Sequence, residues 1–214
     1  MDNTEKYISA LHFRQLTPFY DPLLRWGMHE DLFKCALIRQ AGIRPGMRVL
    51  DLGCGTGTLT ILVKQTYPTS DVTGLDCDPE VLQIAREKAA SAGVEVALDQ
   101  DMAFDLPYPG GSFDRVLSSL MIHHLTRQDK KRSLSEVYRV LCPGGELHIV
   151  DFGIPHSVYG RLASQFSKHL EQVADNLNGL LPGMMSEAGF HQVEVTANYG
   201  TIFGTLSLYR GRKP

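Results

Sequence analysis

The fold is decided by the stretch VLDLGCGTG at residues 49–57, which TLT at residues 58–60 follows. A short apolar run with one carboxylate leads into three glycines at alternate positions. This order predicts a buried strand, a tight turn and the start of a helix. Glycine suits the turn because the backbone must reverse sharply and let a ligand approach with no Cβ in the way. With the unpaired N–H groups of the helix start, the stretch predicts a site for a nucleotide-like ligand.

Strand and helix patterns alternate on the C-terminal side of this turn. The pattern predicts strands at residues 48–52, 71–76, 94–98, 113–119 and 146–151, and helices at residues 58–67, 79–92 and 130–141. Pro79 suits a first helical turn, Gly93 a helix end, and CPGG at residues 142–145 stops the last helix. Alternation at this spacing predicts βαβ units and a mostly parallel α/β sheet.

The N-terminal part, residues 1–44, is helical in character. One helix ends near Gly42, and its apolar face is expected to contain Leu32, Phe33, Ala36, Leu37 and Ile38. Residues 16–26, which hold prolines and aromatics, have two interpretations. They either anchor the N-terminus on the domain or form part of a lid in which Tyr20 and Trp26 face a ligand.

A long apolar stripe at helical spacing runs through residues 156–181. The stripe has three interpretations: a helix that packs on the sheet, a cap that lines a substrate pocket, or a helix on a membrane surface. The polar face mixes positive and negative charges, which disfavours the membrane surface. Residues 191–196 and 204–210 predict two strands that pair antiparallel. We therefore expect one domain, residues 1–214, made of an N-terminal helical lid or anchor (1–44), a cofactor-binding core (45–153), a helical cap (154–190) and a final strand pair (191–214).

The composition is that of an ordinary globular domain, with 214 residues, 43% hydrophobic residues and a net charge of −3. Its tight basic cluster, residues 130–132, is interpreted as a solvated helix face rather than a nucleic-acid site. The four cysteines have no CxxC pair, which argues against a disulfide framework or a structural zinc site. The polar N-terminus and the lack of a run of about 18 apolar residues predict a cytoplasmic protein without a membrane span.

Acidic residues at the ends of successive strands indicate which ligand the turn holds. The glycines read G-x-G-x-G, whereas the dinucleotide fingerprint is G-x-G-x-x-G, and Thr58 stands where its third glycine would fall. Asp76 lies 19 residues after Gly57, where one carboxylate can accept both ribose hydroxyls. Asp101 can accept from an exocyclic adenine amine, and the N–H of Met102 can donate to a ring nitrogen. All three features meet at one edge of a parallel sheet.

Four longer segments strengthen this interpretation: VLDLGCGTG, GLDCDPEVLQIAREKA, QDMAFDLPYPGGSFDRVLSSLMIHHL and EVYRVLCPGGELHIVDF. In this order they resemble the successive motifs of class I S-adenosylmethionine-dependent methyltransferases, over about residues 44–153. The third segment is similar to the small-molecule subgroup of ubiquinone/menaquinone-type C-methyltransferases. The resemblance implies a Rossmann-like, doubly wound sheet of seven strands in the order 3-2-1-4-5-7-6, with strand seven antiparallel.

The resemblance also implies a cofactor site for S-adenosylmethionine, which leaves as S-adenosylhomocysteine. The glycine turn would lie against the methionine and ribose portion, Asp51 would support the methionine end, and the serines ending the fourth strand would face its carboxylate and amine. The cofactor-binding set is Asp51, Gly53, Cys54, Gly55, Gly57, Asp76, Cys77, Asp101, Met102, Ser118 and Ser119. Within the turn, Cys54 is interpreted as a small filler rather than a reactive thiol.

Methyl transfer needs positioning first, and a general base only if the acceptor must lose its proton early. The candidates for catalytic work are His123, His124, Asp151 and Tyr20. His156 and Tyr159 lie further along the chain. The adjacent histidines could serve structural hydrogen bonding, acceptor binding or base work; a metal site is not expected.

The expected function is methyl transfer to a small-molecule acceptor at carbon, oxygen or nitrogen. An N-P-P-Y-like tetrad, paired cysteines and a long basic extension are missing, which disfavours amide or base N-methylation, arsenite and RNA as acceptors. No nucleic-acid partner is expected, and a homodimer is allowed for. Two alternatives stay open: a cofactor-binding but non-catalytic partner protein, and an NAD-linked oxidoreductase.

Overall fold

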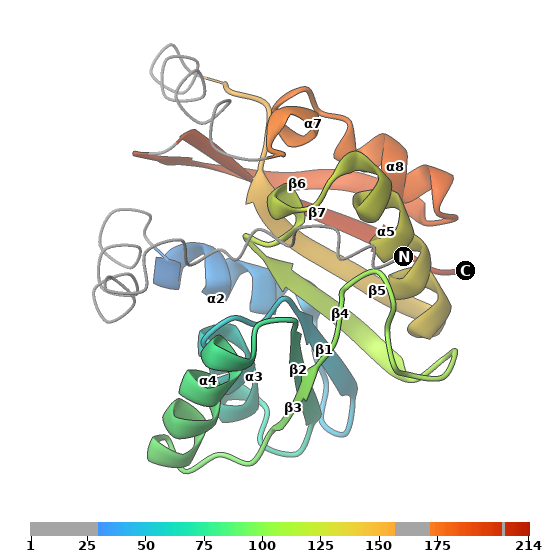
Figure 1. Cartoon of the computed structure of the whole chain (residues 1–214). Helices are drawn as coiled ribbons and strands as arrows, with labels where there is room; N and C mark the ends of the chain where they lie inside the picture. The colour runs from blue at the N-terminus through green and yellow to red at the C-terminus, as the bar shows by residue number, and fades with distance from the viewer. Residues whose placement is uncertain (1–29, 157–171, 203) are drawn as a thin grey trace, which may run out of the picture.

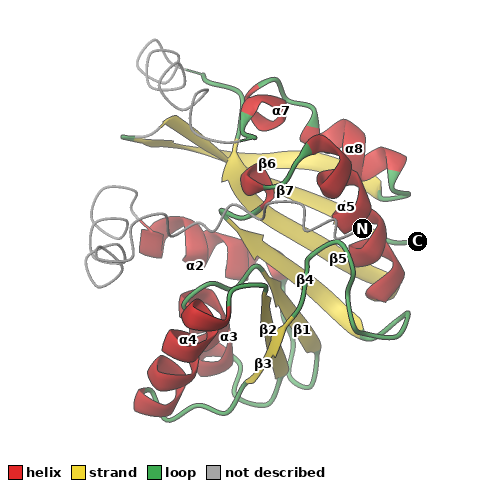
Figure 2. Ribbon diagram, viewed as in Figure 1, coloured by secondary structure: helices red, strands yellow, loops and turns green. Residues whose placement is uncertain are grey.

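The computed structural model describes residues 30–156, 172–202 and 204–214. Within them, seven strands form one sheet in the order β3-β2-β1-β4-β5-β7-β6 (Figure 1, Figure 2). The strands are β1 (Arg48–Leu52), β2 (Asp71–Asp76), β3 (Ala97–Gln100), β4 (Phe113–Ser119), β5 (Leu141–Phe152), β6 (His191–Thr201) and β7 (Gly204–Arg212). β7 runs antiparallel to β5 and β6, and the other pairs are parallel. The strand order and directions implied by the resemblance are confirmed.

Helices cover both faces of the sheet, so the fold is doubly wound. They are α2 (Glu30–Ala41), α3 (Thr58–Thr66), α4 (Pro79–Ser91), the 3-10 turn η1 (Ile122–His124), α5 (Arg127–Val140), α7 (Ala174–Leu177) and α8 (Leu181–Glu187). In Figure 1, α2, α3 and α4 lie on one side of the sheet, and α5, α7 and α8 on the other. Among the described helices, none has both the length and the apolar character that crossing a bilayer requires.

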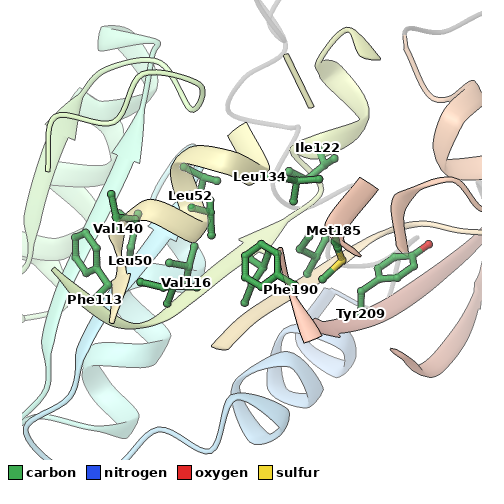
Figure 3. Close-up of a cluster of buried hydrophobic side chains, with 14 of the residues drawn as sticks. Leu50, Leu52, Phe113, Val116, Ile122, Leu134, Val140, Met185, Phe190 and Tyr209 are labelled. Carbon is green, nitrogen blue, oxygen red and sulfur yellow. The ribbon is translucent and has the colours of Figure 1, made fainter. Parts of the chain in front are cut away.

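Side chains of the central strands alternate between two hydrophobic cores, one on each face. In β1, Val49 packs in the core beneath α2 and α3, whereas Leu50 and Leu52 pack in the core beneath α5 and α8. Figure 3 shows the latter core, in which Leu134 of α5 and Met185 of α8 pack among the strand residues. Burial on both faces explains why β1 reads as an apolar run interrupted only by Asp51.

Helix α2 is tied to two strands by Gln40 near its end. Nε2 of Gln40 lies 3.1 Å from Nδ1 of His148 in β5 and donates to the carbonyl of Tyr209 in β7 at 3.0 Å. The helix ends at Ala41, as expected, because Gly42 adopts the left-handed conformation with φ of 54°. One expected member of its buried face is wrong, because the side chain of Leu32 is 58% exposed.

The expected starts of two strands are wrong. In both cases a backbone N–H near the start has a partner that the sequence pattern did not indicate. The strand expected from residue 94 begins at Ala97, because the N–H of Val94 donates to a carbonyl of α4 at 3.1 Å and completes the helix end. The strand expected from residue 146 begins at Leu141. There the N–H of Gly144 donates to the carbonyl of Lys213 at 2.9 Å, so the CPGG segment joins the sheet instead of turning away.

The helix expected at residues 130–141 begins three residues earlier, at Arg127. Thr126 caps its N-terminus, since the threonine hydroxyl oxygen accepts the N–H of Asp129.

The continuous helix expected at residues 156–181 is wrong in its described part. Residues 157–171 lie outside the described ranges. Beyond them, α7 ends at Leu177 and α8 starts at Leu181, and Gly179 turns the chain between the two with φ of 70°. Leu177 and Leu181 are both buried, which explains the apolar spacing, but they belong to different helices.

The basic cluster at residues 130–132 is only partly a solvated face. Lys131 and Arg132 are about half exposed, but Lys130 is fully buried. Its Nζ donates to the carbonyl of Gln172 at 2.6 Å and lies 3.7 Å from the carboxylate of Asp175. Burial lowers the pKa of Lys130, and the Asp175 carboxylate opposes that shift. The interpretation failed because α5 turns this lysine toward the start of α7.

We predict that Lys130→Met lowers the free energy of unfolding by on the order of 3 kcal/mol, because it removes the cation from a buried ion pair. Urea denaturation measures the change. Lys131→Met on the same helix is the control and should stay within about 0.5 kcal/mol of the wild type. Equal unfolding midpoints for the two variants would contradict the prediction.

Candidate functional site

The glycine turn joins β1 to α3 and is closed by the end of β2. The N–H groups of Gly53 and Cys54 both donate to the carbonyl of Leu75, at 2.8 and 3.0 Å. Gly53, Gly55 and Gly57 have φ values of 70°, 53° and 75°, in the left-handed region that favours glycine. The turn predicted from the spacing is therefore present, and α3 begins directly after Gly57.

The three glycines differ in what surrounds the missing side chain. A Cβ on Gly53 would lie 2.2 Å from Cγ of Met121, and one on Gly57 would lie 2.9 Å from Cβ of Ala85. Within the described ranges, a Cβ on Gly55 would meet nothing within 4 Å. The outer glycines thus allow other parts of the protein to pack closely on the turn. The middle one has open space above its backbone.

Asp76 connects the end of β2 to this turn. One carboxylate oxygen accepts the N–H of Gly55 at 2.8 Å, and the other accepts the N–H of Asp78 at 3.1 Å. Cys77 follows directly, and its thiol donates to Oδ1, the oxygen that also accepts the Asp78 N–H, at 3.8 Å. Oδ2, which accepts the Gly55 N–H, has a second lone pair with which it can accept a hydroxyl donor.

Asp51 lies beneath the turn and is 1% exposed. The hydroxyl of Thr60 in α3 donates to its carboxylate at 2.6 Å. Burial raises the pKa of Asp51 to about 6, although the Thr60 hydrogen bond and the charge of Lys34 both oppose the shift. This carboxylate therefore responds to any additional charge that a ligand brings to the turn.

Cys54 occupies the inner side of the turn and is 8% exposed. Its sulfur lies 2.9 Å from where a Cβ on Gly74 would stand, so it fills space against β2. Burial raises the pKa of the Cys54 thiol, which keeps it protonated and unreactive. These facts agree with the interpretation of Cys54 as a filler.

Asp101 and Met102 follow β3 at the same edge, as expected, but their hydrogen bonds differ from the expectation. The N–H of Asp101 donates to the carbonyl of Asp76 at 3.2 Å. The N–H of Met102, expected to be offered to a ligand nitrogen, donates instead to the carboxylate of Asp101 at 2.8 Å. This short-range bond holds the Asp101 carboxylate close to its own backbone.

The two serines at the end of β4 have different surroundings. The hydroxyl of Ser118 is buried and donates to the carbonyl of Leu52 at 3.1 Å. The Oγ of Ser119 is buried and has no hydrogen-bond partner among the residues that the structure describes. An unpaired buried hydroxyl costs about 1–3 kcal/mol, which a polar ligand at this edge would recover. Ser118 is thus committed to the fold, whereas Ser119 offers a hydroxyl.

His123 and Asp151 form a buried pair at the ends of β4 and β5. Nδ1 of His123 lies 2.8 Å from one oxygen of Asp151, and the His123 N–H donates to the other at 3.2 Å. Burial by itself would raise the pKa of Asp151, but the charge and hydrogen bond of His123 outweigh it and lower the pKa. An ionised Asp151 favours a proton on Nδ1 of His123 and fixes the orientation of the ring.

The other candidate residues lie next to this pair, beyond the end of β5 or outside the described residues. The ring of His124 lies 4.1 Å from that of His123 between centroids, and His156 is exposed beyond the end of β5. Tyr20, Trp26 and Tyr159 lie outside the described residues. In the described ranges, no group of three or more histidines, cysteines or acids is arranged to hold a metal ion.

Two residues of the site escaped the sequence interpretation. Lys34 of α2 is 8% exposed, and its charge acts on Asp51. Its spacing from Leu37 and Ile38 places it on the buried helix face. The spacing could have predicted this burial, but a charged residue is not usually expected on a buried face. Met121 packs against Gly53, a contact between distant parts of the chain that no local pattern announces.

Comparison with known proteins agrees with this geometry. The family model described as a methyltransferase domain matches residues 49–145. Demethylmenaquinone methyltransferase of Thermus thermophilus is 34% identical, over 80% of this chain and 77% of that protein. The chain belongs to the S-adenosylmethionine-dependent methyltransferases of the ubiquinone/menaquinone C-methyltransferase type. The C-methyltransferase UbiE of Shewanella sediminis is 33% identical, over 94% of this chain and 88% of the relative.

Solved methyltransferase structures share the fold. The methyltransferase SibL has a TM-score of 0.72 and 26% identity, over 92% of this chain and 60% of that chain. Phosphoethanolamine N-methyltransferase 2 of Haemonchus contortus, in complex with S-adenosylmethionine, has a TM-score of 0.73 and 20% identity, over 95% of this chain and 59% of that chain. The protein is thus an S-adenosylmethionine-dependent methyltransferase that acts on a small molecule. Neither the non-catalytic nor the NAD-linked alternative finds support in these comparisons.

We predict that Gly53→Ala mainly lowers the stability of this methyltransferase, whereas Gly55→Ala mainly weakens ligand binding. Gly53→Ala should lower the free energy of unfolding by at least about 2 kcal/mol, because the new methyl meets Met121 and the conformation is strained. Gly55→Ala should cost only about 1 kcal/mol, since strain alone opposes it. It should nevertheless weaken S-adenosylhomocysteine binding by about tenfold or more in isothermal titration. Unchanged binding by Gly55→Ala would refute the assignment of the open space.

Proposed function

We propose that this protein transfers a methyl group to a ring carbon of a quinol-type acceptor. The observation that carries the proposal is the extent of the similarity to its relatives. The cofactor core accounts for residues 49–145, yet the match with the C-methyltransferase UbiE of Shewanella sediminis spans 94% of the chain. Similarity therefore includes the segments outside the core, among them residues 16–26 and 156–181, for which the sequence analysis offered a lid and a cap among its interpretations. That relative and the Thermus thermophilus enzyme are named for methylation in quinone biosynthesis.

The residues at the carboxyl edge fit the cofactor. We assign the open space at Gly55 to its methionine and ribose portion, Asp76 to the ribose hydroxyls and Asp101 to the adenine amine. The unpaired hydroxyl of Ser119 supports a polar ligand group beside β4. Asp51 supports the cationic end from beneath the turn, with Gly53, Cys54, Gly57, Cys77, Met102 and Ser118 shaping the surroundings.

The cofactor supplies a methyl group on a positively charged sulfur, which makes a good neutral leaving group. An oxidised quinone ring is electron-poor, so the acceptor must be the quinol, whose ring carbon becomes nucleophilic when a neighbouring hydroxyl loses its proton. Once methylated, that carbon loses its own hydrogen as a proton, which restores the aromatic ring while the oxygen regains a proton, so one proton is released overall. The protein's part is to align the carbon and to take up the hydroxyl proton.

His123 is the residue we assign to that proton. An oxygen of Asp151 lies 2.8 Å from Nδ1 of His123 and favours a proton on that nitrogen. We therefore assign the role of base to Nε2. The same carboxylate accepts the backbone N–H of His123 and thereby fixes the position of the ring. The ring of Phe152 stands edge-on at 4.9 Å between centroids and further restricts the imidazole. His124 is assigned to acceptor binding, and Tyr20 stays a prediction from the sequence, as do a cytoplasmic location and a homodimer.

We predict that the enzyme methylates a demethylated naphthoquinol with a short side chain, kept reduced by dithionite. The assay uses S-adenosylmethionine with a ¹³C-labelled methyl, and NMR of the product separates a methyl on carbon from one on oxygen. The oxidised quinone and phosphoethanolamine serve as controls and should stay unlabelled. A methyl on oxygen, or transfer to phosphoethanolamine instead, would overturn the proposal.

A second prediction concerns the histidine. His123→Gln should lower kcat by about 10²- to 10⁴-fold, the usual contribution of a general base. Its affinity for S-adenosylhomocysteine should stay within about twofold, since the side chain acts on the acceptor. Asp151→Asn should lower kcat in the same direction, because an amide can stabilise the wrong tautomer. The exposed His191→Gln is the matched control; equal kcat for both histidine variants would exclude His123 as the base.

A further inference from the structure

The loop between β3 and β4 carries Asp101 but has no regular structure of its own, so its backbone groups need other partners. It starts at Asp101, whose N–H donates to the carbonyl of Asp76 at 3.2 Å. A turn follows, in which the N–H of Asp105 donates to the carbonyl of Met102 at 3.1 Å. Past this turn lies Leu106, which is 4% exposed, so its buried N–H and carbonyl have little access to water.

Helix α5 supplies the missing partners. The carboxylate of Glu136 accepts the N–H of Leu106 at 2.9 Å. The guanidinium of Arg139 donates to the carbonyls of Leu106 and Tyr108, at 2.9 and 2.6 Å. The carbonyl of Arg139 also accepts the N–H of Gly111 at 3.1 Å. One turn of α5 thus satisfies the backbone groups of the loop, mostly through side-chain hydrogen bonds. The helix and the loop lie near one another in Figure 1.

Glu136 and Arg139 also bind one another, with contacts of 2.8 and 2.6 Å. As an exposed pair three residues apart on a helix, they would contribute only about 0.3–0.5 kcal/mol. Their bonds to the loop have a different consequence. They fix Leu106, and the chain from Leu106 back to Asp101 is a single tight turn.

We infer that Glu136 and Arg139 are positioning residues that set the place of the Asp101 carboxylate and thereby the recognition of the 6-amino group of the cofactor's adenine. The inference rests on the role proposed above for Asp101. Neither side chain needs to touch the cofactor.

On the far side of the turn, Arg139 binds the backbone carbonyls and Glu136 binds the N–H of Leu106. The Arg132 guanidinium lies 4.6 Å from the centroid of the Phe104 ring within the turn, and the Asp76 carbonyl holds the near side. Glu136 and Arg139 supply the hydrogen bonds that stop the turn from pivoting about these two anchors.

The direction of these bonds makes the inference testable. Arginine has only donors and an ionised glutamate only acceptors. Exchanging the two residues, Glu136→Arg with Arg139→Glu, restores a helix ion pair of opposite sense. It cannot restore the loop bonds, because a carboxylate would then face carbonyls and a guanidinium would face an N–H.

The experiment compares two ligands by isothermal titration: S-adenosylhomocysteine and S-inosylhomocysteine, in which an oxygen replaces the 6-amino group. The wild type should prefer the amino ligand by about tenfold or more, the scale of a hydrogen bond to a charged group. Asp101→Ala, which removes the side-chain acceptor altogether, should abolish the preference. The exchanged double variant should reduce it to about threefold or less. Glu136→Gln keeps an acceptor for Leu106 and should retain the preference, as should the control Lys131→Met on the same helix.

Three outcomes would count against the proposals, and they are distinguishable. If Asp101→Ala keeps the preference, the proposed role of Asp101 is wrong. If Asp101→Ala loses the preference but the folded exchanged variant keeps it, the positioning role is wrong. Equal weakening of both ligands with the preference intact would show a structural role only and also overturn the inference. If the exchanged variant fails to fold, Arg139→Lys replaces it, because lysine keeps the positive charge but lacks the several guanidinium donors. A preference reduced below that of the wild type would support the positioning role, and an unchanged preference would overturn it.

Discussion

The glycine turn depends on acceptors that belong to another strand. The carbonyl of Leu75 accepts two N–H groups of the turn, and the carboxylate of Asp76 accepts a third, from Gly55 at 2.8 Å. Both acceptors lie at the end of β2, so the turn takes its form only when β1 and β2 pair in the register that sets Leu52 beside Leu75. The cofactor cradle is therefore a product of sheet assembly, and its rigidity comes from the buried sheet beneath it.

Buried charge gathers at this same edge, and each charge has a different partner. Asp51 and Asp151 occupy comparable places near the ends of β1 and β5, yet their pKa values shift in opposite directions. Asp51 receives a neutral hydroxyl from Thr60, so burial dominates and raises its pKa to about 6. Asp151 receives the imidazole and backbone N–H of His123, which together outweigh burial. One carboxylate can adjust to a nearby charge, whereas the other stays ionised and orients the His123 ring.

Helix α5 connects the parts of the site that the sheet alone does not join. It begins just after η1, which carries His123, and its buried Lys130 bonds the segment leading into α7 at Gln172. Its last turns hold the loop that follows Asp101. A displacement of this one helix would therefore move the loop after Asp101, the turn that carries His123 and the segment leading into α7.

Local pattern was sufficient for much of the cofactor side. Glycine spacing, apolar runs and acids at strand ends are short-range features, and parallel strands bring their carboxyl ends to one edge. The turn at residues 53–57 and the positions of Asp76 and Asp101 could therefore be predicted. The seven-strand order came from resemblance of the successive motifs, since no local pattern specifies which strands become neighbours.

The sequence by itself determined the turn, the class of fold and the class of cofactor, because these follow from short patterns: the glycine spacing, the apolar runs and the acids at strand ends. Only the tertiary structure decided what depends on distant partners. It buried Lys130 against Gln172, placed Met121 on Gly53 and joined His123 to Asp151 across 28 residues. Each of these outcomes is a hydrogen bond or a packing contact between segments far apart in the chain, whose energy no local spacing contains.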